Sequence, residues 1–353
     1  MIFRIGRGIC AFLLVFLISA NLVYAKSLLK KDLFEITEIF TIGVDEPSSE
    51  DEIPNQFYNI SEIDVDKENN VYVLDRKAYN IKIFDENGKF VRKILKKGQG
   101  PNEISNLAGF RLNRFSGNIF VITDYGYRLK EFDTSGNFIK FYHLPEQFFH
   151  YFEFIDNARL LYIPIKSDDK KNNFNFKLLN TSTLKIEKSF ALVKIEKALR
   201  HRQIFTINKN ILWTSPCDQV KLIAYSLDNF EKVKEINIPG DFKQNTIKVK
   251  ELVGGAKALR NIYYAVAYPL FVNRRLFSFV QIQDYKNKGK EGIEDFPNNS
   301  NLFLYLLDFD KQAVISVGNL KGCDFLRPGA VNGNRVYLFG NDPYPRVKVL
   351  KIE

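Results

Sequence analysis

The sequence predicts an all-β fold, a six-bladed β-propeller built from four-stranded antiparallel blades. Three observations predict it: an internal repeat of about 48 residues, strand-like patterning within each repeat, and an aromatic-rich composition. Aromatic residues make up 14% of the 353 residues, with 32 Phe against a single Met. Aromatic residues favour sheet over helix. A repeat of this length with about four strands is typical of a propeller blade.

The repeat is clearest between two neighbouring segments. VLDRKAYNIKIFDENGKF (73–90) aligns without gaps on VITDYGYRLKEFDTSGNF (121–138), an offset of 48 that places Tyr79 on Tyr127. In each segment a D-x-x-G turn joins two β-patterned runs, as expected for a hairpin. These two segments define the blade frame for the rest of the chain.

Looser copies of the unit fill the remaining sequence. The second strand of each blade is expected to begin, in order, at Val71, Ile119, Leu160, Ile211, Leu276 and Val336. The last unit ends after its third strand, whereas the strand predicted at 33–42 has no unit of its own. We therefore expect the N-terminal strand to complete the last blade and close the ring, which removes two exposed sheet edges.

Two long connections interrupt the regular spacing. Residues 239–262 join the fourth unit to the fifth, and residues 283–301 separate the second and third strands of the fifth. Connections of these two kinds emerge on the same face of a propeller, called here the loop face. Long polar loops on a rigid scaffold often bind ligands, but they are also tolerated as plain insertions.

The first 25 residues have the pattern of an export signal. Arg4 and Arg7 form a charged start, an apolar run follows, and small residues precede a cleavage site near Ala25. The apolar run is too short for a comfortable membrane span, so no integral membrane protein is expected. We predict that residues 26–353 form a single propeller domain that is periplasmic or extracellular.

Charge and cysteine usage limit the partners. The formal net charge is +10, but the lysines lie among acids rather than in clusters, which argues against nucleic-acid binding. Cys217 and Cys323 remain after removal of the leader. An oxidising compartment would allow them to pair, but two cysteines so far apart in sequence are more often separate small core residues.

The segment Gly98–Glu103, with the sequence GQGPNE, follows the unit VYVLD…IKIFDENGKF. On these residues the chain resembles bacterial exported NHL-like six-bladed β-propellers. The resemblance is specific over 57–144 and implies the fold and a role in binding ligands or proteins. The glycines and the proline fit a turn between blades, because no helix start follows to form a phosphate loop.

Polar and aromatic residues gather in the connections that follow the second strands of the first two blades. We expect them to form a binding surface on the loop face for a protein, peptide or carbohydrate, because tyrosine and arginine are favoured in interfaces. The alternative is that the aspartates hold turns and the tyrosines pack between blades. The candidate binding residues are Asp75, Arg76, Tyr79, Asp124, Tyr127 and Arg128.

Two histidines could hold a metal. His150 and His201 each lie ten residues before the expected second strand of their blade, near the central channel. A catalytic zinc usually takes three protein ligands, and no third histidine is in phase. The favoured function is therefore a non-catalytic binding module without a cofactor. The alternative is a metal-dependent hydrolase or lyase, using Zn²⁺ or Ca²⁺ at the channel mouth, and the sequence leaves the choice between enzyme and scaffold open.

Overall fold

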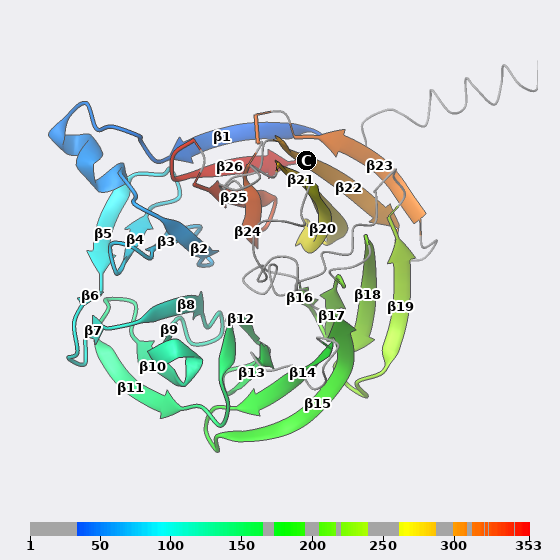
Figure 1. Ribbon diagram of the computed structural model, residues 1–353, viewed down its shortest axis with the longest axis horizontal. Helices are drawn as coiled ribbons and strands as arrows, with labels where there is room; N and C mark the ends of the chain where they lie inside the picture. The colour runs from blue at the N-terminus through cyan, green and yellow to red at the C-terminus, as the bar shows by residue number, and fades with distance from the viewer. Residues whose placement is uncertain are drawn as a thin grey trace, which may run out of the picture. The chain divides into compact units, whose positions relative to one another are not determined.

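Six four-stranded antiparallel sheets follow one another around a ring (Figure 1). The prediction of an all-β, six-bladed propeller is thereby confirmed. Residues Ile36–Glu353 form one compact unit. The computed structural model describes residues 34–164, 173–194, 205–216, 220–238, 261–286, 299–308, 313–320, 322–323, 325–341 and 343–353.

In blades one to five, the four strands follow one another along the chain, from the channel outward. Blade one contains β2 (Ile60–Val65), β3 (Val71–Asp75), β4 (Asn80–Phe84) and β5 (Phe90–Ile94), and blade two contains β8 (Leu107–Leu112), β9 (Ile119–Thr123), β10 (Arg128–Phe132) and β11 (Phe138–His143). Blade three contains β12 (Phe148–Phe154), β13 (Arg159–Pro164), β14 (Asn173–Asn180) and β15 (Lys185–Lys194), and blade four contains β16 (Phe205–Asn208), β17 (Ile211–Thr214), β18 (Lys221–Ser226) and β19 (Lys232–Asn237). Blade five contains β20 (Asn261–Val272), β21 (Arg275–Lys286), β22 (Asn299–Asp308) and β23 (Ala313–Asn319).

Blade six draws strands from both ends of the propeller unit. Its order is β1 (Ile36–Ile42), β26 (Arg346–Ile352), β25 (Arg335–Gly340) and β24 (Arg327–Asn332). β1 pairs antiparallel with β26, from Ile36 opposite Ile352 to Ile42 opposite Val347. The N-terminal strand therefore covers an edge of β26 that would otherwise face solvent.

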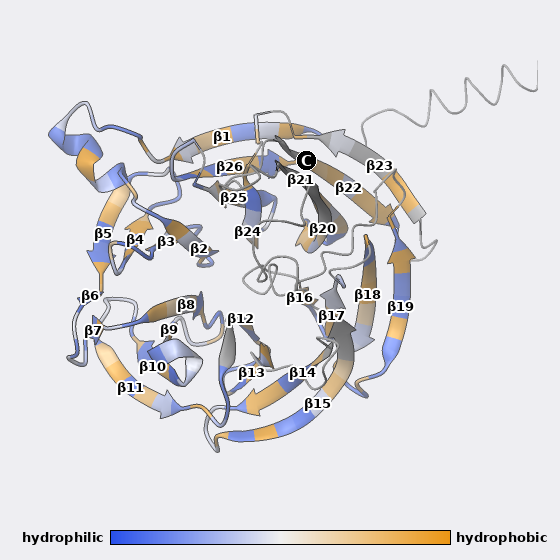
Figure 2. Ribbon diagram, viewed as in Figure 1, coloured by the Kyte–Doolittle hydropathy of each residue, from blue (hydrophilic) through white to orange (hydrophobic). Residues whose placement is uncertain are grey.

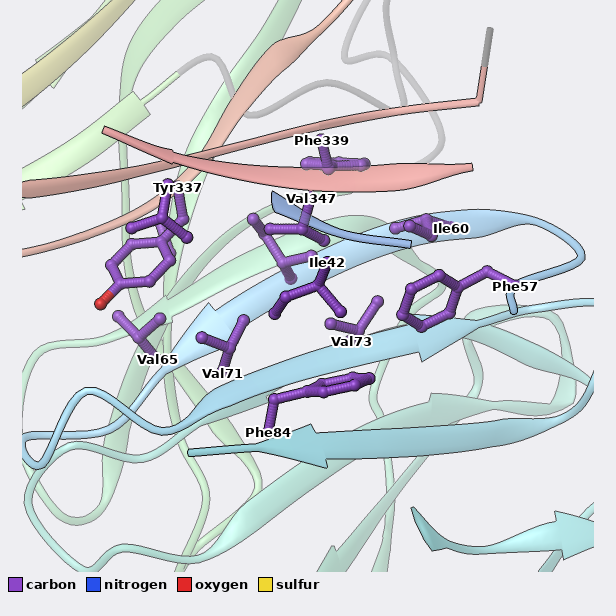
Figure 3. Packing of buried hydrophobic residues seen from close by; sticks show 13 residues of the cluster. Ile42, Phe57, Ile60, Val65, Val71, Val73, Phe84, Tyr337, Phe339 and Val347 are labelled. Atoms are coloured by element: carbon purple, nitrogen blue, oxygen red, sulfur yellow. The ribbon is translucent and has the colours of Figure 1, made fainter. Parts of the chain in front are cut away.

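The core lies between the blades rather than in the channel. Figure 3 shows the cluster between blades six and one, where Tyr337 and Phe339 face Val71, Val73 and Phe84. All five of these side chains are buried. Along the outer strands, hydrophobic and hydrophilic positions alternate, as Figure 2 shows for β15 and β19. This alternation is expected of strands with one face packed on a neighbouring blade and the other toward solvent.

The hairpin of blade five is longer than those of its neighbours. β20 and β21 have twelve residues each and stay paired from Val272 opposite Arg275 to Asn261 opposite Lys286. Pairing therefore continues into both stretches that the sequence assigned to insertions. The remainders of these insertions, 239–260 and 287–298, lie outside the described residues.

The glycine-proline segment forms a compact connection between blades one and two. β6 (Lys96–Lys97) and β7 (Glu103–Ile104) pair in parallel, and the Gly98 amide donates to the Ile104 carbonyl at 3.2 Å. The Glu103 side chain packs directly against Gly98, where an added Cβ would lie 2.0 Å from its Oε2 and 3.1 Å from its Cβ. This geometry agrees with the expectation of a turn between blades.

Helical structure is confined to short turns in the described part of the chain. η1 (Glu50–Asn55) and η2 (Asp124–Gly126) are 3₁₀ segments. No helix there has the length and apolar character needed to cross a membrane. Cys323 is buried, and Cys217 lies outside the described residues, so their pairing stays a prediction.

Candidate functional site

Asp75 was predicted as a binding residue, and it lies fully buried at the end of β3. Its carboxylate accepts hydrogen bonds from the backbone amides of Tyr58 at 2.8 Å and Asn59 at 3.0 Å. Asp75 thus joins the end of β3 to the residues that precede the innermost strand, β2. The neighbouring Arg76 is exposed, and Tyr79 is half-buried with Lys97 Nζ 5.1 Å from its ring centre.

The corresponding residues of blade two are more accessible. Asp124 and Arg128 form an ion pair at 3.2 Å, and the Arg128 guanidinium lies 5.7 Å from the ring centre of Phe141. The side chain of Tyr127 is 49% exposed, and that of Tyr125 is 73% exposed. The structure therefore places Tyr127 and Arg128 on the solvent-exposed surface, close to Asp124. Whether they bind a partner stays a prediction.

The sequence predicts His150 and His201 as metal ligands. His201 and the side chain of His150 lie outside the described residues. Among the side chains that the structure does describe, no group of three or more His, Cys, Asp and Glu residues is arranged to hold a metal ion. The metal-dependent alternative therefore stays a prediction.

A different set of charged side chains converges on the central channel. Glu62 and Asp64 alternate along β2, and both carboxylates are buried. Glu62 Oε2 accepts from the Phe110 amide at 2.9 Å, and Asp64 Oδ2 accepts from the Leu112 amide at 2.9 Å. The innermost strand of a blade is a sheet edge with unpaired amides. The carboxylates of Glu62 and Asp64 on blade one thus accept from two of these amides on β8 of blade two.

Arg111 completes this buried arrangement. Its Nη1 lies 3.2 Å from Glu62 Oε2 and donates to the Phe110 carbonyl at 2.8 Å. The guanidinium carbon is 4.0 Å from the ring centre of Tyr151 on β12, which is a stacked cation–π contact. Arg111 is only 5% exposed, and contacts with the Glu62 carboxylate, the Phe110 carbonyl and the Tyr151 ring compensate its buried charge.

A cavity of about 210 Å³ opens onto these residues at one mouth of the channel. We call it the channel-mouth pocket. It lies at the turns between first and second strands, on the face opposite the loop face. Its charged lining is Asp64 and Arg111 with Arg114, which follows β8, and Glu153 on β12. Residues from blades four, five and six complete it, including Asn208, Leu270 and Asn332.

Arg114 connects the channel-mouth pocket with a second cavity. That cavity has a volume of about 420 Å³ and lies between the turns of blades one and two, where Tyr72 and Phe115 line it. Arg114 and Asn332 border both cavities. The Arg114 side chain is 54% exposed, in contrast to the buried Arg111.

Burial controls the charge state of this site. Desolvation raises the pKa of Glu62 to about 7, although Arg111 and the Phe110 amide favour the carboxylate. Desolvation also raises the pKa of Glu153, and Arg114 opposes that shift. The pKa of Arg114 is raised, because Glu153 and Asp64 outweigh the cost of desolvation. Both arginines therefore remain charged, whereas the two glutamates are the groups that can change protonation.

Sequence reasoning missed the channel-mouth pocket. The available signal was the alternation of Glu62 and Asp64 with apolar residues in an innermost strand, which places two acids on one face of β2. Their hydrogen-bonded partners, Phe110 and Leu112, each lie 48 residues further along. The offset of the repeat therefore also relates each acid to the backbone amide that it satisfies in the next blade.

Comparison with known proteins supports the fold. The family model described as "Domain of unknown function (DUF4934)" matches residues 57–223, just under half of the chain. No curated protein matches. A member of the DUF4221 family from Bacteroides vulgatus ATCC 8482 is similar in structure, with a TM-score of 0.63 and 15% identity over 92% of this chain and 99% of that one. A predicted exported protein from Bacteroides fragilis NCTC 9343 has a TM-score of 0.57 and 14% identity over 92% and 96% of the two chains. At these identities the similarity shows the fold alone, a β-propeller shared with bacterial proteins.

Proposed function

We propose that the protein is a non-catalytic binding module that takes a small polar ligand in the channel-mouth pocket. One observation carries the proposal: charged side chains of both signs from the inner strands of blades one to three line a single cavity at the channel. In line with this role, we propose that the protein is exported by a signal cleaved near Ala25 and acts in the periplasm or outside the cell, as an NHL-like propeller.

The charged residues divide into two groups by their contacts. Asp64 and Arg111 line the pocket and are bonded to backbone groups of β8, and Glu62 pairs with Arg111 behind that lining. Arg114 and Glu153 border the same cavity with fewer hydrogen bonds to the protein. Charged groups with spare hydrogen-bonding capacity are the polar groups that orient a ligand in a pocket.

A thermal-shift screen with a panel of small polar compounds tests the proposal. A ligand that binds only the folded protein stabilises it by about 2.7 kcal/mol at 100 times its Kd, which raises Tm by a few degrees. The substitution Asn208→Trp should fill the pocket and abolish the shift. Lys93→Trp, which adds the same ring on the exposed outer strand β5, serves as the control and should retain it. A shift that survives Asn208→Trp would place the binding site elsewhere.

A further inference from the structure

Arg114 is a charged donor in the channel-mouth pocket, and it has no hydrogen-bond acceptor among the residues that the structure describes. The nearest acid, Asp64 Oδ1, lies 3.9 Å from its Nη2, which is beyond hydrogen-bonding distance. Among the described residues its guanidinium makes no hydrogen bond, whereas the buried Arg111 bonds to Glu62 and to the Phe110 carbonyl. A guanidinium presents five N–H groups in a fork that matches a carboxylate.

Glu153 is the complementary acceptor in the same pocket. The Tyr151 hydroxyl donates to its Oε2 at 3.0 Å, and within the described part of the chain Oε1 accepts no hydrogen bond. Glu153 and Arg114 interact electrostatically. Glu153 raises the pKa of Arg114 and Arg114 lowers the pKa of Glu153, so each favours the charged form of the other. Among the described residues no ion pair within 4.0 Å joins them, and both side chains line the same cavity.

The size and charge balance of the channel-mouth pocket narrow the ligand class. Its volume of about 210 Å³ is below the roughly 300–1,000 Å³ of sites for drug-sized ligands, so a small metabolite fits it. Asp64 and Glu153 balance Arg111 and Arg114. A ligand with two negative charges would be repelled by the two acids, and a ligand with two positive charges would be repelled by the two arginines. A neutral ligand would leave Arg114 and Glu153 without an ionic partner in the pocket.

We propose that the channel-mouth pocket binds a zwitterion, a free α-amino acid with a small or polar side chain. The ligand carboxylate lies against the Arg114 guanidinium, and its ammonium group lies against Glu153, with Asp64 adding negative potential. Both contacts are charge-assisted hydrogen bonds, which are stronger than hydrogen bonds between neutral groups. This assignment rests on the proposed function, because it names the ligand class of the same pocket.

Isothermal titration calorimetry of the full mature chain tests the assignment with matched probes. Glycine, L-serine, L-alanine and L-glutamine represent the class. L-glycerate replaces the ammonium group of serine by a hydroxyl, and ethanolamine lacks its carboxylate. We expect at least one of the four amino acids to bind, and both analogues of serine to bind at least tenfold more weakly than serine when serine is that ligand.

Two neutral variants test the contributions of Arg114 and Glu153 separately. Arg114→Gln and Glu153→Gln should each weaken amino-acid binding at least tenfold, and Glu153→Gln should remove the preference for serine over glycerate. Arg114→Lys, which retains the charge, should lose less than Arg114→Gln. Arg159→Gln changes a surface arginine paired with Asp156 in blade three and should leave the affinity unchanged. Circular dichroism and Tm establish that each variant is folded.

The outcomes distinguish this inference from the proposed function. Binding of an amino acid that is lost in both neutral variants supports the zwitterion assignment. If none of the four amino acids binds, or if binding survives both neutral variants, the assignment is overturned. The binding-module proposal still stands when another ligand gives a thermal shift that Asn208→Trp abolishes. Absence of any ligand-dependent shift overturns both.

Discussion

Glu62 Oε2 lies 3.2 Å from Arg111 Nη1, and the two residues belong to the innermost strands of adjacent blades. The contact is buried on both sides, with side-chain exposures of 8% and 6%. A buried pair of this kind does not by itself imply a large gain in stability, because removing two charges from water offsets much of their attraction. Its clearer consequence is a dependence of stability on pH.

Replacing Glu62 with Gln should flatten the pH profile of stability. Desolvation raises the pKa of Glu62 from 4.5 to about 7 in the folded protein. The folded state then binds more protons than the unfolded state between these values, so the unfolding free energy falls as pH rises through about 7. The contribution is on the order of 3 kcal/mol between pH 4 and pH 8. Urea unfolding at intervals across this range measures it.

The comparison between wild type and Glu62→Gln isolates this group, because glutamine retains an acceptor for the Phe110 amide. A wild-type profile that is flat from pH 4 to pH 8, or one whose decline is as steep in Glu62→Gln as in the wild type, would show that Glu62 does not titrate as described.

Lys130 on β10 should stabilise the connection between blades one and two. Its Nζ donates to the carbonyl oxygens of Gly100 at 3.2 Å and Glu103 at 2.8 Å. Lys130→Met keeps the apolar stem but leaves these acceptors without their donor, which should cost about 1–2 kcal/mol in urea unfolding. Lys140→Met, which alters a 57% exposed lysine of the same blade, should change stability by less than about 0.5 kcal/mol. Equal effects of the two substitutions would contradict a role for Lys130 in this turn.

The N-terminal strand should contribute to stability through its inward face. Ile42 is 3% exposed in the cluster between blades six and one, whereas Ile39 on the same strand is 38% exposed. Ile42→Ala should lower the unfolding free energy by about 2–4 kcal/mol, and Ile39→Ala by less than about 1 kcal/mol. Denaturant unfolding of the two variants supplies the test. A small loss in Ile42→Ala would mean that β1 is not required for a closed ring.

The blade frame could be predicted because it depends on local signals. A D-x-x-G turn and strands of period two recur at a fixed offset, so the aligned segments 73–90 and 121–138 fix the first two blades. Lys82 and Lys130 also align in the repeat, and both donate to carbonyls of the connection that precedes their blade. The alignment of the two repeats therefore also pairs the lysines that make this contact in each blade.

The channel-mouth pocket could not be predicted in the same way, because bulges change which face a residue occupies. The pairing of β2 with β3 shifts between Ile60 and Glu62, and that of β8 with β9 shifts between Leu107 and Gly109. Each shift reverses the alternation for the rest of the strand. Asp75 shows a second limit, since an aspartate that ends a strand has the same sequence signature whether it holds a turn or binds a ligand.

Metal analysis separates the binding module from the metal-dependent alternative. Protein purified without chelator should contain well under one equivalent of transition metal, and EDTA should leave its Tm unchanged. Elemental analysis and a thermal melt measure both quantities. A stoichiometric metal that is lost in His150→Ala or His201→Ala would instead support an enzyme at the channel mouth.

The predicted loop-face residues should divide into a structural and a surface group. Asp75→Ala removes the acceptor for the amides of Tyr58 and Asn59, so two backbone donors lose their partner at a buried site. We expect a loss of at least about 2 kcal/mol in urea unfolding, with Asp75→Asn intermediate because it retains one oxygen. Tyr127→Ala removes a side chain that is 49% exposed and should cost less than about 1 kcal/mol. If Asp75→Ala were as stable as wild type, its carboxylate would be available for a ligand rather than committed to the fold.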